Sequence, residues 1–258
     1  MPVASDVSGL GSNDNGDGDG LPINELFYSL QGEGKLSGVP SVFVRTSGCN
    51  LRCWFCDSYH TSWEPTGARL SIEDIVDEVR EYEHAGHVVL TGGEPMIHEQ
   101  AVPLLDELAA YGYHTTVETN GTIYRDAAID LASISPKLSN STPTPDRDPK
   151  GDGEWERRHE DQRIDLEALT NLVDEYESQL KFVVTGADDL SEIDALVDRI
   201  RGRVDVTVPN DDVLLMPEGM TRATLDKNRN HVAELAMERG YRYTPRLHVD
   251  LWNDEPGT

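Results

Sequence analysis

The fold and the chemistry of this chain are decided by one stretch, Cys49-Asn-Leu-Arg-Cys53-Trp-Phe-Cys56, which holds all three cysteines in the spacing CxxxCxxC. Thiols this close together cannot easily pair as disulfides, and one of three would be left over. Soft thiolates suit an iron-sulphur cluster, and four of them normally close a four-iron cluster. The stretch therefore predicts a 4Fe-4S cluster on Cys49, Cys53 and Cys56, with one iron open to a further ligand and to function.

Two simpler interpretations of the cysteines stay open at this point. One is a nonenzymatic zinc-binding module in which His60 completes the site, although structural zinc sites usually show CxxC pairs. The other is three buried thiols that are neighbours by chance, although Asn50, Arg52 and Asp57 make this loop polar.

Short β-branched runs alternate with amphipathic segments along the chain, which predicts a parallel sheet with right-handed helical crossovers. We expect an α/β single domain curled into a full or partial (β/α) barrel, with functional residues at the carboxyl ends of the strands. Ser71 and Asp74 resemble a capping box, and Gly86 and Gly112 are placed to end helices. The expected strands are 41–45, 87–90, 114–118, 133–135, 180–184 and 204–208, and the expected helices are 71–83, 97–111, 166–176, 190–200 and 221–239.

Two segments are not expected to belong to the core, which we place at 22–258. Residues 1–21 are polar, acidic and glycine-rich, and we expect a disordered extension. Residues 139–164 are Pro-rich and charged, and we expect an insert that forms a surface loop or lid.

The chain carries 22 Lys and Arg residues against 48 Asp and Glu, a net charge of −26. Such a chain repels nucleic acid and anionic membranes, so we expect neither as a partner. The charge is typical of a salt-adapted, haloarchaeal-like protein, because screening at roughly 1 M salt shortens the Debye length to about 3 Å. No apolar run is long enough to span a membrane and residues 1–20 lack signal-peptide regions, so we expect a cytoplasmic protein.

The CxxxCxxC spacing with Phe55 before the last cysteine resembles the signature of radical S-adenosylmethionine (radical SAM) enzymes. Within that superfamily the chain is similar to the 7-carboxy-7-deazaguanine synthase (QueE) family in the order of its segments over most of residues 23–252. Those segments are Phe27-Tyr-Ser-Leu-Gln-Gly-Glu-Gly34, Gly38-Val-Pro40, Phe43-Val-Arg45, Gly48-Cys-Asn-Leu51, Cys56-Asp57-Ser58, Thr91-Gly-Gly-Glu-Pro95, Glu118-Thr-Asn-Gly121, Ser135-Pro-Lys137, Lys181-Phe182 and Arg246-Leu-His248.

The resemblance implies a site for SAM beside the cluster. Glu94 of the GGEP segment would accept from the SAM amino group, with Gly92 and Gly93 letting the backbone approach. The strand-end segments would contact the SAM ribose and carboxylate. The implied cofactor-binding residues are Phe55, Asp57, Gly92, Gly93, Glu94, Thr119, Asn120, Ser135, Pro136 and Lys137.

The resemblance also implies a pterin substrate. Gln31 and Glu33 would read its aminopyrimidinone edge, and Arg45 would pair with its carboxylate. An arginine on a strand faces either solvent or the barrel interior, and burial would require an anionic partner. The implied substrate residues are Leu30, Gln31, Gly32, Glu33, Arg45 and Thr91, with His248 a weaker candidate. Mg²⁺ would be held by Ser58, where the family has threonine and where the loss of a methyl frees the rotamer.

The activity that the resemblance implies is a lyase reaction from 6-carboxy-5,6,7,8-tetrahydropterin to 7-carboxy-7-deazaguanine, with loss of ammonia, in queuosine or archaeosine biosynthesis. It further implies an electron donor such as flavodoxin or ferredoxin, and a homodimer. Another radical SAM enzyme, such as a glycyl-radical activase, would share the cysteines and GGEP but has no reason to carry Gln31, Glu33 and Arg45 in this order.

Overall fold

The computed structural model describes residues 3–5, 7, 20–253 and 255. In this part of the chain ten strands form one sheet in the order β1-β2-β3-β5-β6-β7-β8-β9-β10, with β4 paired to β2. From β3 to β10 each neighbour pairs in parallel, whereas β1, β2 and β4 pair antiparallel. Among the described strands none joins β10 back to β1, so the barrel is partial. The strands are β1 (Val3–Ser5), β2 (Leu21–Leu30), β3 (Pro40–Thr46), β4 (Ala68–Leu70), β5 (His87–Gly92), β6 (His114–Thr119), β7 (Leu131–Ile134), β8 (Ser178–Val184), β9 (Val213–Pro217) and β10 (Arg242–Tyr243).

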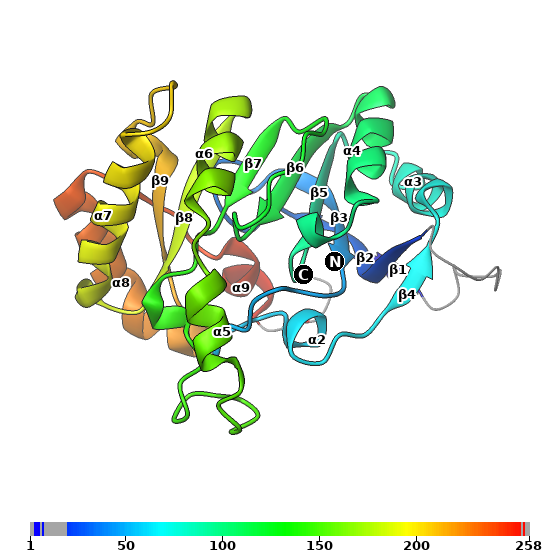
Figure 1. Ribbon diagram of the computed structural model, residues 1–258. Helices are drawn as coiled ribbons and strands as arrows, with labels where there is room; N and C mark the ends of the chain where they lie inside the picture. The colour runs from blue at the N-terminus through cyan, green and yellow to red at the C-terminus, as the bar shows by residue number, and fades with distance from the viewer. Residues whose placement is uncertain (1–2, 6, 8–19, 254, 256–258) are drawn as a thin grey trace.

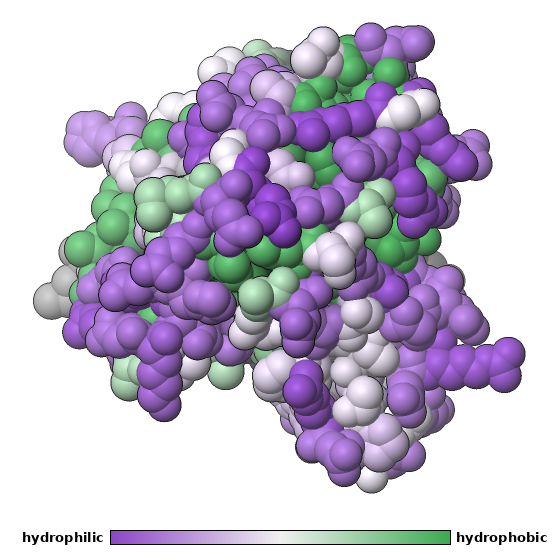
Figure 2. All heavy atoms as spheres, turned by 90° about the vertical axis from the view of Figure 1, so that its left-hand side faces the viewer, coloured by the Kyte–Doolittle hydropathy of each residue, from purple (hydrophilic) through white to green (hydrophobic). Residues whose placement is uncertain are grey.

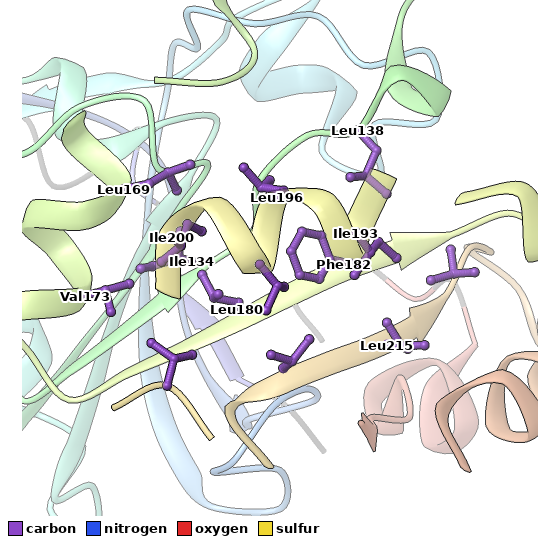
Figure 3. Close-up of a cluster of buried hydrophobic side chains, with 14 of the residues drawn as sticks. Ile134, Leu138, Leu169, Val173, Leu180, Phe182, Ile193, Leu196, Ile200 and Leu215 are labelled. Atoms are coloured by element: carbon purple, nitrogen blue, oxygen red, sulfur yellow. The ribbon is translucent and has the colours of Figure 1, made fainter. Parts of the chain in front are cut away.

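Helices cover the outer face of this sheet (Figure 1). One apolar core packs α3 and α4 against β2, β3, β5 and β6. The other, drawn in Figure 3, packs α6, α7 and α8 against β7, β8 and β9. The helices are α2 (Tyr59–Ser62), α3 (Ile72–Arg80), α4 (Ala101–Ala110), α5 (Trp155–Gln162), α6 (Leu166–Glu175), α7 (Leu190–Arg201), α8 (Arg222–Arg239) and α9 (Leu247–Trp252).

Alternation along the strands separates this core from the inner face of the sheet. On β3, Val42 and Val44 are fully buried in the core, while Phe43 and Arg45 face the inside. Phe43 stacks there on Phe27, with ring centroids 4.9 Å apart. Strands of this kind bring polar side chains inward without disturbing the apolar layer under the helices.

Five of the expected strands are confirmed within a few residues, but the one at 204–208 is wrong. That segment is a loop in which the amides of Asp205 and Val206 donate to the Asp174 carboxylate at 2.8 and 3.3 Å. Its alternating valines resemble a half-buried strand, yet the strand that follows α7 is the fully buried β9. The elements that were not expected from the sequence are β1, β2, β4, β9 and β10 and the helices α2, α5 and α9.

The five expected helices are confirmed, and Ser71 and Gly112 stand at helix ends as expected. Ser71 Oγ accepts from the Asp74 amide at 3.0 Å and caps α3, which is the N-cap bond of the expected capping box, and the Asp74 carboxylate accepts from Ser71 Oγ at 2.7 Å. Gly112, at φ +85°, follows the last residues of α4. Gly86 is not a helix stop, because α3 already ends at Arg80.

The two segments assigned outside the core include ordered parts. Most of 1–21 lies outside the described residues, but Val3–Ser5 pair with β2, and Leu21 begins β2 itself. Segment 139–164 is more than a surface loop, since it contains α5 and a histidine, His159, that is fully buried.

The face shown in Figure 2 is mostly hydrophilic, with scattered apolar patches. Over the described residues, no helix is both long enough and apolar enough to cross a membrane.

Candidate active site

The carboxyl ends of the parallel strands and the loops after them surround a cavity of ≈ 430 Å³. Ligand sites commonly have a volume of roughly 300–1,000 Å³, so this one is large enough for a small molecule. Most residues singled out from the sequence meet here. Those that line the cavity are Leu30, Gln31, Gly32, Glu33, Arg45, Cys49, Cys53, Phe55, Cys56, Asp57, Ser58, Thr91, Gly92, Gly93, Thr119, Asn120, Ser135, Lys137 and His248.

The three cysteines lie together in the loop after β3, and all are free thiols. The amide of Leu51 donates to Cys49 Sγ at 3.4 Å, and the hydroxyl of Ser62 donates to Cys56 Sγ at 3.2 Å. Burial raises the pKa of the Cys53 thiol to about 12. A metal centre would have to displace that proton, as metal binding to thiols does in general.

This donor set fits an iron-sulphur cluster better than a zinc ion. A single zinc ion needs ligands that converge to about 2.0–2.3 Å from one point. Within the described part of the chain, no group of three His, Cys, Asp or Glu side chains is placed to do so. His60 was considered as a fourth zinc ligand, but its Nε2 lies 3.9 Å from Glu25 Oε2.

Glu94 does not line the cavity, contrary to the expectation that it would meet an amino group there. It is fully buried, and its carboxylate accepts from the Met96 amide at 3.0 Å, the Thr119 hydroxyl at 2.8 Å and the Asn120 amide at 2.6 Å. Glu94 therefore joins the end of β5 to the end of β6. Pro136 is also absent from the cavity wall.

The other strand-end residues selected from the sequence, Thr119, Asn120, Ser135 and Lys137, line the cavity. Asn120 Nδ2 donates to Asn50 Oδ1 at 2.9 Å, so the end of β6 is tied to the cysteine loop. Lys137 Nζ donates to Ser135 Oγ at 2.7 Å beyond β7. Its positive charge opposes the effect of burial on the pKa of Cys53.

Glu33 lines the cavity, and its carboxylate is held by two buried cations, Lys181 and Arg246. Its Oε2 lies 2.5 Å from Lys181 Nζ, and its Oε1 accepts from Arg246 Nε at 3.0 Å. Burial acts to raise the pKa of Glu33, but Lys181 and Arg246 outweigh it and hold that pKa well below its usual range. Arg246 also pairs with Asp57, next to the last cysteine. The glutamate is therefore a fixed anion at neutral pH.

A second carboxylate, Glu118 on β6, stands beside the first. It accepts from Thr91 Oγ1 at 2.8 Å and from Gln31 Nε2 at 3.2 Å. Gln31 in turn accepts from the Glu33 amide at 3.1 Å. Lys181 Nζ, which bonds to Glu33, lies 4.0 Å from Glu118 Oε1, so both glutamates belong to one network in the cavity wall.

Arg45 faces the barrel interior and has the anionic partner that burial requires, because its Nε lies 2.9 Å from Glu25 Oε2. Its NH1 donates to Ser58 Oγ at 3.0 Å, and Ser58 Oγ donates to Asp57 Oδ1 at 3.3 Å.

Five charged residues that were not predicted from the sequence as site residues also line the cavity: Glu25, Glu118, Lys181, Glu218 and Arg246. Lys181 carried a usable signal, since a lysine inside a strand of buried apolar residues requires an anion. Glu118 and Arg246 stood in the quoted family segments without an assigned role.

Comparison with known proteins agrees with this geometry. Residues 43–140 match the model of the Radical SAM superfamily. The 7-carboxy-7-deazaguanine synthase of Halobacterium salinarum is 67% identical over 258 residues, 100% of both chains, and that of Rhodopirellula baltica is 43% identical over 92% of this chain and 89% of its own. The crystal structure of QueE from Escherichia coli aligns with a TM-score of 0.63 and 26% identity, covering 89% of this chain and 95% of that one. The chain belongs to the 7-carboxy-7-deazaguanine synthase family of radical SAM enzymes.

Proposed function

We propose that this protein is a radical SAM lyase that converts 6-carboxy-5,6,7,8-tetrahydropterin into 7-carboxy-7-deazaguanine with loss of ammonia. The observation that carries the proposal is the fixed, ionised Glu33 carboxylate in the same cavity as the three thiols. A pterin edge presents adjacent N–H donors, which a carboxylate held by two cations can accept without reorganising.

The remaining substrate contacts follow from the cavity wall. Glu118, fixed by Thr91 and Gln31, offers a second acceptor for the pterin ring. Arg45, held by Glu25, offers the positive charge that the substrate carboxylate needs. Burial lowers the pKa of His248, so it faces the cavity as a neutral ring. These groups orient the substrate, and the walls exclude water from it.

The cofactor side is assigned to the cysteine loop and the ends of β5 to β7. Cys49, Cys53 and Cys56 would bind the 4Fe-4S cluster, which with SAM supplies the one-electron chemistry that starts the reaction. Asn120, Ser135 and Lys137 would hold the SAM ribose and carboxylate. The amino group would meet the backbone at Gly92 and Gly93, because Glu94 lies behind the wall.

Mg²⁺ is proposed at Ser58, whose hydroxyl stands beside the Asp57 carboxylate at 3.3 Å. Hard oxygen donors of this kind suit the ion, and the substrate carboxylate would complete its coordination.

We also propose an oligomeric state, an electron donor, a pathway and an environment for the protein. The family resemblance supports a homodimer, an electron donor such as flavodoxin or ferredoxin, and a place in queuosine or archaeosine biosynthesis. The net charge of −26 supports a cytoplasm of high salt and a free small-molecule substrate in place of tRNA.

The function is tested by anaerobic reconstitution with iron and sulphide in high salt. Dithionite, SAM, Mg²⁺ and 6-carboxytetrahydropterin are then added, and 7-carboxy-7-deazaguanine is followed by mass spectrometry. We expect product that depends on SAM and iron. If SAM is cleaved but the pterin is unchanged, the protein is a radical SAM enzyme with a different substrate. If the protein binds zinc and no iron, the whole assignment is wrong.

Replacement of Gly32 by alanine should weaken substrate binding while leaving the cluster intact. A Cβ there would stand 1.9 Å from His248 Nδ1, so the ring must move within the cavity. Overpacking of this kind costs roughly 1–3 kcal/mol in folding free energy. Because the displaced ring also changes the wall that faces the substrate, the KM for the pterin should rise by roughly 10-fold or more. Steady-state kinetics measure it.

The matched control for Gly32→Ala is Gly86→Ala, where an added Cβ meets nothing within 4 Å. Its KM should equal that of the unaltered protein. An unchanged KM in Gly32→Ala would remove His248 from the substrate site.

A further inference from the structure

Segment 139–164, which no part of the proposed function uses, lies directly against the loop that carries the cysteines. Three donors of the cysteine loop bind to it. The Trp54 amide donates to the Ser141 carbonyl at 3.2 Å, and Trp54 Nε1 donates to the Asn140 carbonyl at 2.7 Å. The Arg52 amide, between the first and second cysteines, donates to His159 Nδ1 at 3.1 Å.

His159 is built into this contact and is fully buried on α5. Its Nε2 lies 2.9 Å from Ser141 Oγ, whose own hydrogen is directed at the Leu138 carbonyl at 2.6 Å. The ring is therefore the tautomer that carries its hydrogen on Nε2 and accepts at Nδ1. Burial lowers the pKa of His159 to about 4, which keeps the ring neutral. His159 Nδ1 thus joins the segment to the cysteine loop, and Nε2 joins α5 to Ser141, whose carbonyl accepts from the Trp54 amide.

Aromatic contacts act in the same direction. The Arg52 guanidinium lies 4.3 Å from the ring centre of Trp155 at the start of α5, and its NH1 donates to the carbonyls of Cys49 and Leu51, each at 2.7 Å. Arg147 lies 5.2 Å from the ring centre of Trp54. Contacts of this type add to hydrogen bonds where the charge is partly desolvated. The segment thereby holds the loop backbone at the first cysteine as well as between the second and third.

We propose that segment 139–164 is a strap that fixes the cysteine loop in its ligand-binding conformation before any cluster is present, with His159 as the positioning residue. The alternative of a mobile lid over the cavity does not account for a buried histidine bonded to the loop backbone. The proposal rests on the cluster-binding part of the proposed function and is independent of the substrate.

The first test is amide hydrogen exchange of the full-length protein without a cluster, read over residues 49–56. His159→Phe keeps an aromatic ring at this position but leaves the Arg52 amide without an acceptor, so the exchange of that amide should accelerate about tenfold or more. His159→Asn places an acceptor oxygen close to the position of Nδ1 and should restore most of the protection. Arg157→Ala, on the same helix with a side chain that is 94% exposed, should match the unaltered protein.

The second test is the rate at which reconstituted protein loses iron to a chelator without oxygen, followed by visible absorption. His159→Phe should lose iron roughly tenfold faster, and Arg157→Ala at the original rate. If His159→Phe does not fold, Trp54→Phe replaces it, since it removes the bond to the Asn140 carbonyl while keeping an aromatic ring beside Arg147, and it should also accelerate exchange and iron loss. Unchanged exchange and iron loss in the variant that folds would overturn the strap. Failure to form product while these results hold would overturn the substrate alone.

Discussion

Replacing Cys53 by alanine should abolish product formation. Cys53 is the middle one of the three cysteines and is buried in the wall of the cavity. The chain has no fourth cysteine that could replace it as a ligand. Two thiolates cannot hold a four-iron cluster with a single open iron, so the variant should bind little iron after reconstitution and show no SAM cleavage. Iron content, visible absorption and the mass of the products measure the three effects together.

Ser62→Ala is the matched control for Cys53→Ala. It alters the same neighbourhood, removing the hydroxyl that donates to Cys56 Sγ at 3.2 Å, but it keeps every thiol. This control should bind iron and form product, with a change of roughly 10-fold at most in rate. A Cys53→Ala protein that still held a full cluster and turned over would contradict the three-thiolate site.

The features that could be predicted from the sequence are those set by neighbouring residues. The CxxxCxxC motif is a local spacing of residues, and short β-branched runs indicate strands such as β3 and β8. The sequence also predicted that Arg45, if it were buried in the interior, would require an anionic partner, and Glu25 is that partner.

The features that escaped prediction join distant parts of the chain. Glu33 meets Lys181 at a separation of 148 residues and Arg246 at 213, and no local pattern encodes either pairing. The position of Glu94 escaped prediction for a related reason. The sequence shows that a carboxylate is present, but it does not show that this carboxylate accepts hydrogen bonds from three donors, two of which lie in β6 or directly after it. The error at 204–208 arose because an alternating run can satisfy its amides with a side chain such as Asp174.

Replacing Lys181 by methionine should lower kcat/KM for the pterin by about 30- to 1,000-fold. Lys181 is 5% exposed and bonds to Glu33 Oε2, so methionine fills most of its volume but leaves that oxygen without its partner. Truncating one partner of a buried, hydrogen-bonded charge pair in a binding site weakens binding by roughly 2–4 kcal/mol or more, and here the remaining partner is the carboxylate proposed to read the substrate. Steady-state kinetics at saturating SAM measure the effect, and iron content should not change.

The pH profile separates this role from a general loss of structure. With Lys181 present the pKa of Glu33 lies well below its usual range, so the carboxylate stays ionised down to acidic pH. Without that cation the pKa rises, and kcat/KM should begin to fall at a higher pH than in the unaltered protein, because protonation removes the acceptor. The matched control is Lys35→Met, which removes a partly buried lysine outside the cavity whose Nζ lies 2.7 Å from Asp212 Oδ1. This variant should leave the pH profile of kcat/KM unchanged. An acidic limb at the same pH in Lys181→Met would mean that Glu33 does not read the substrate as an anion.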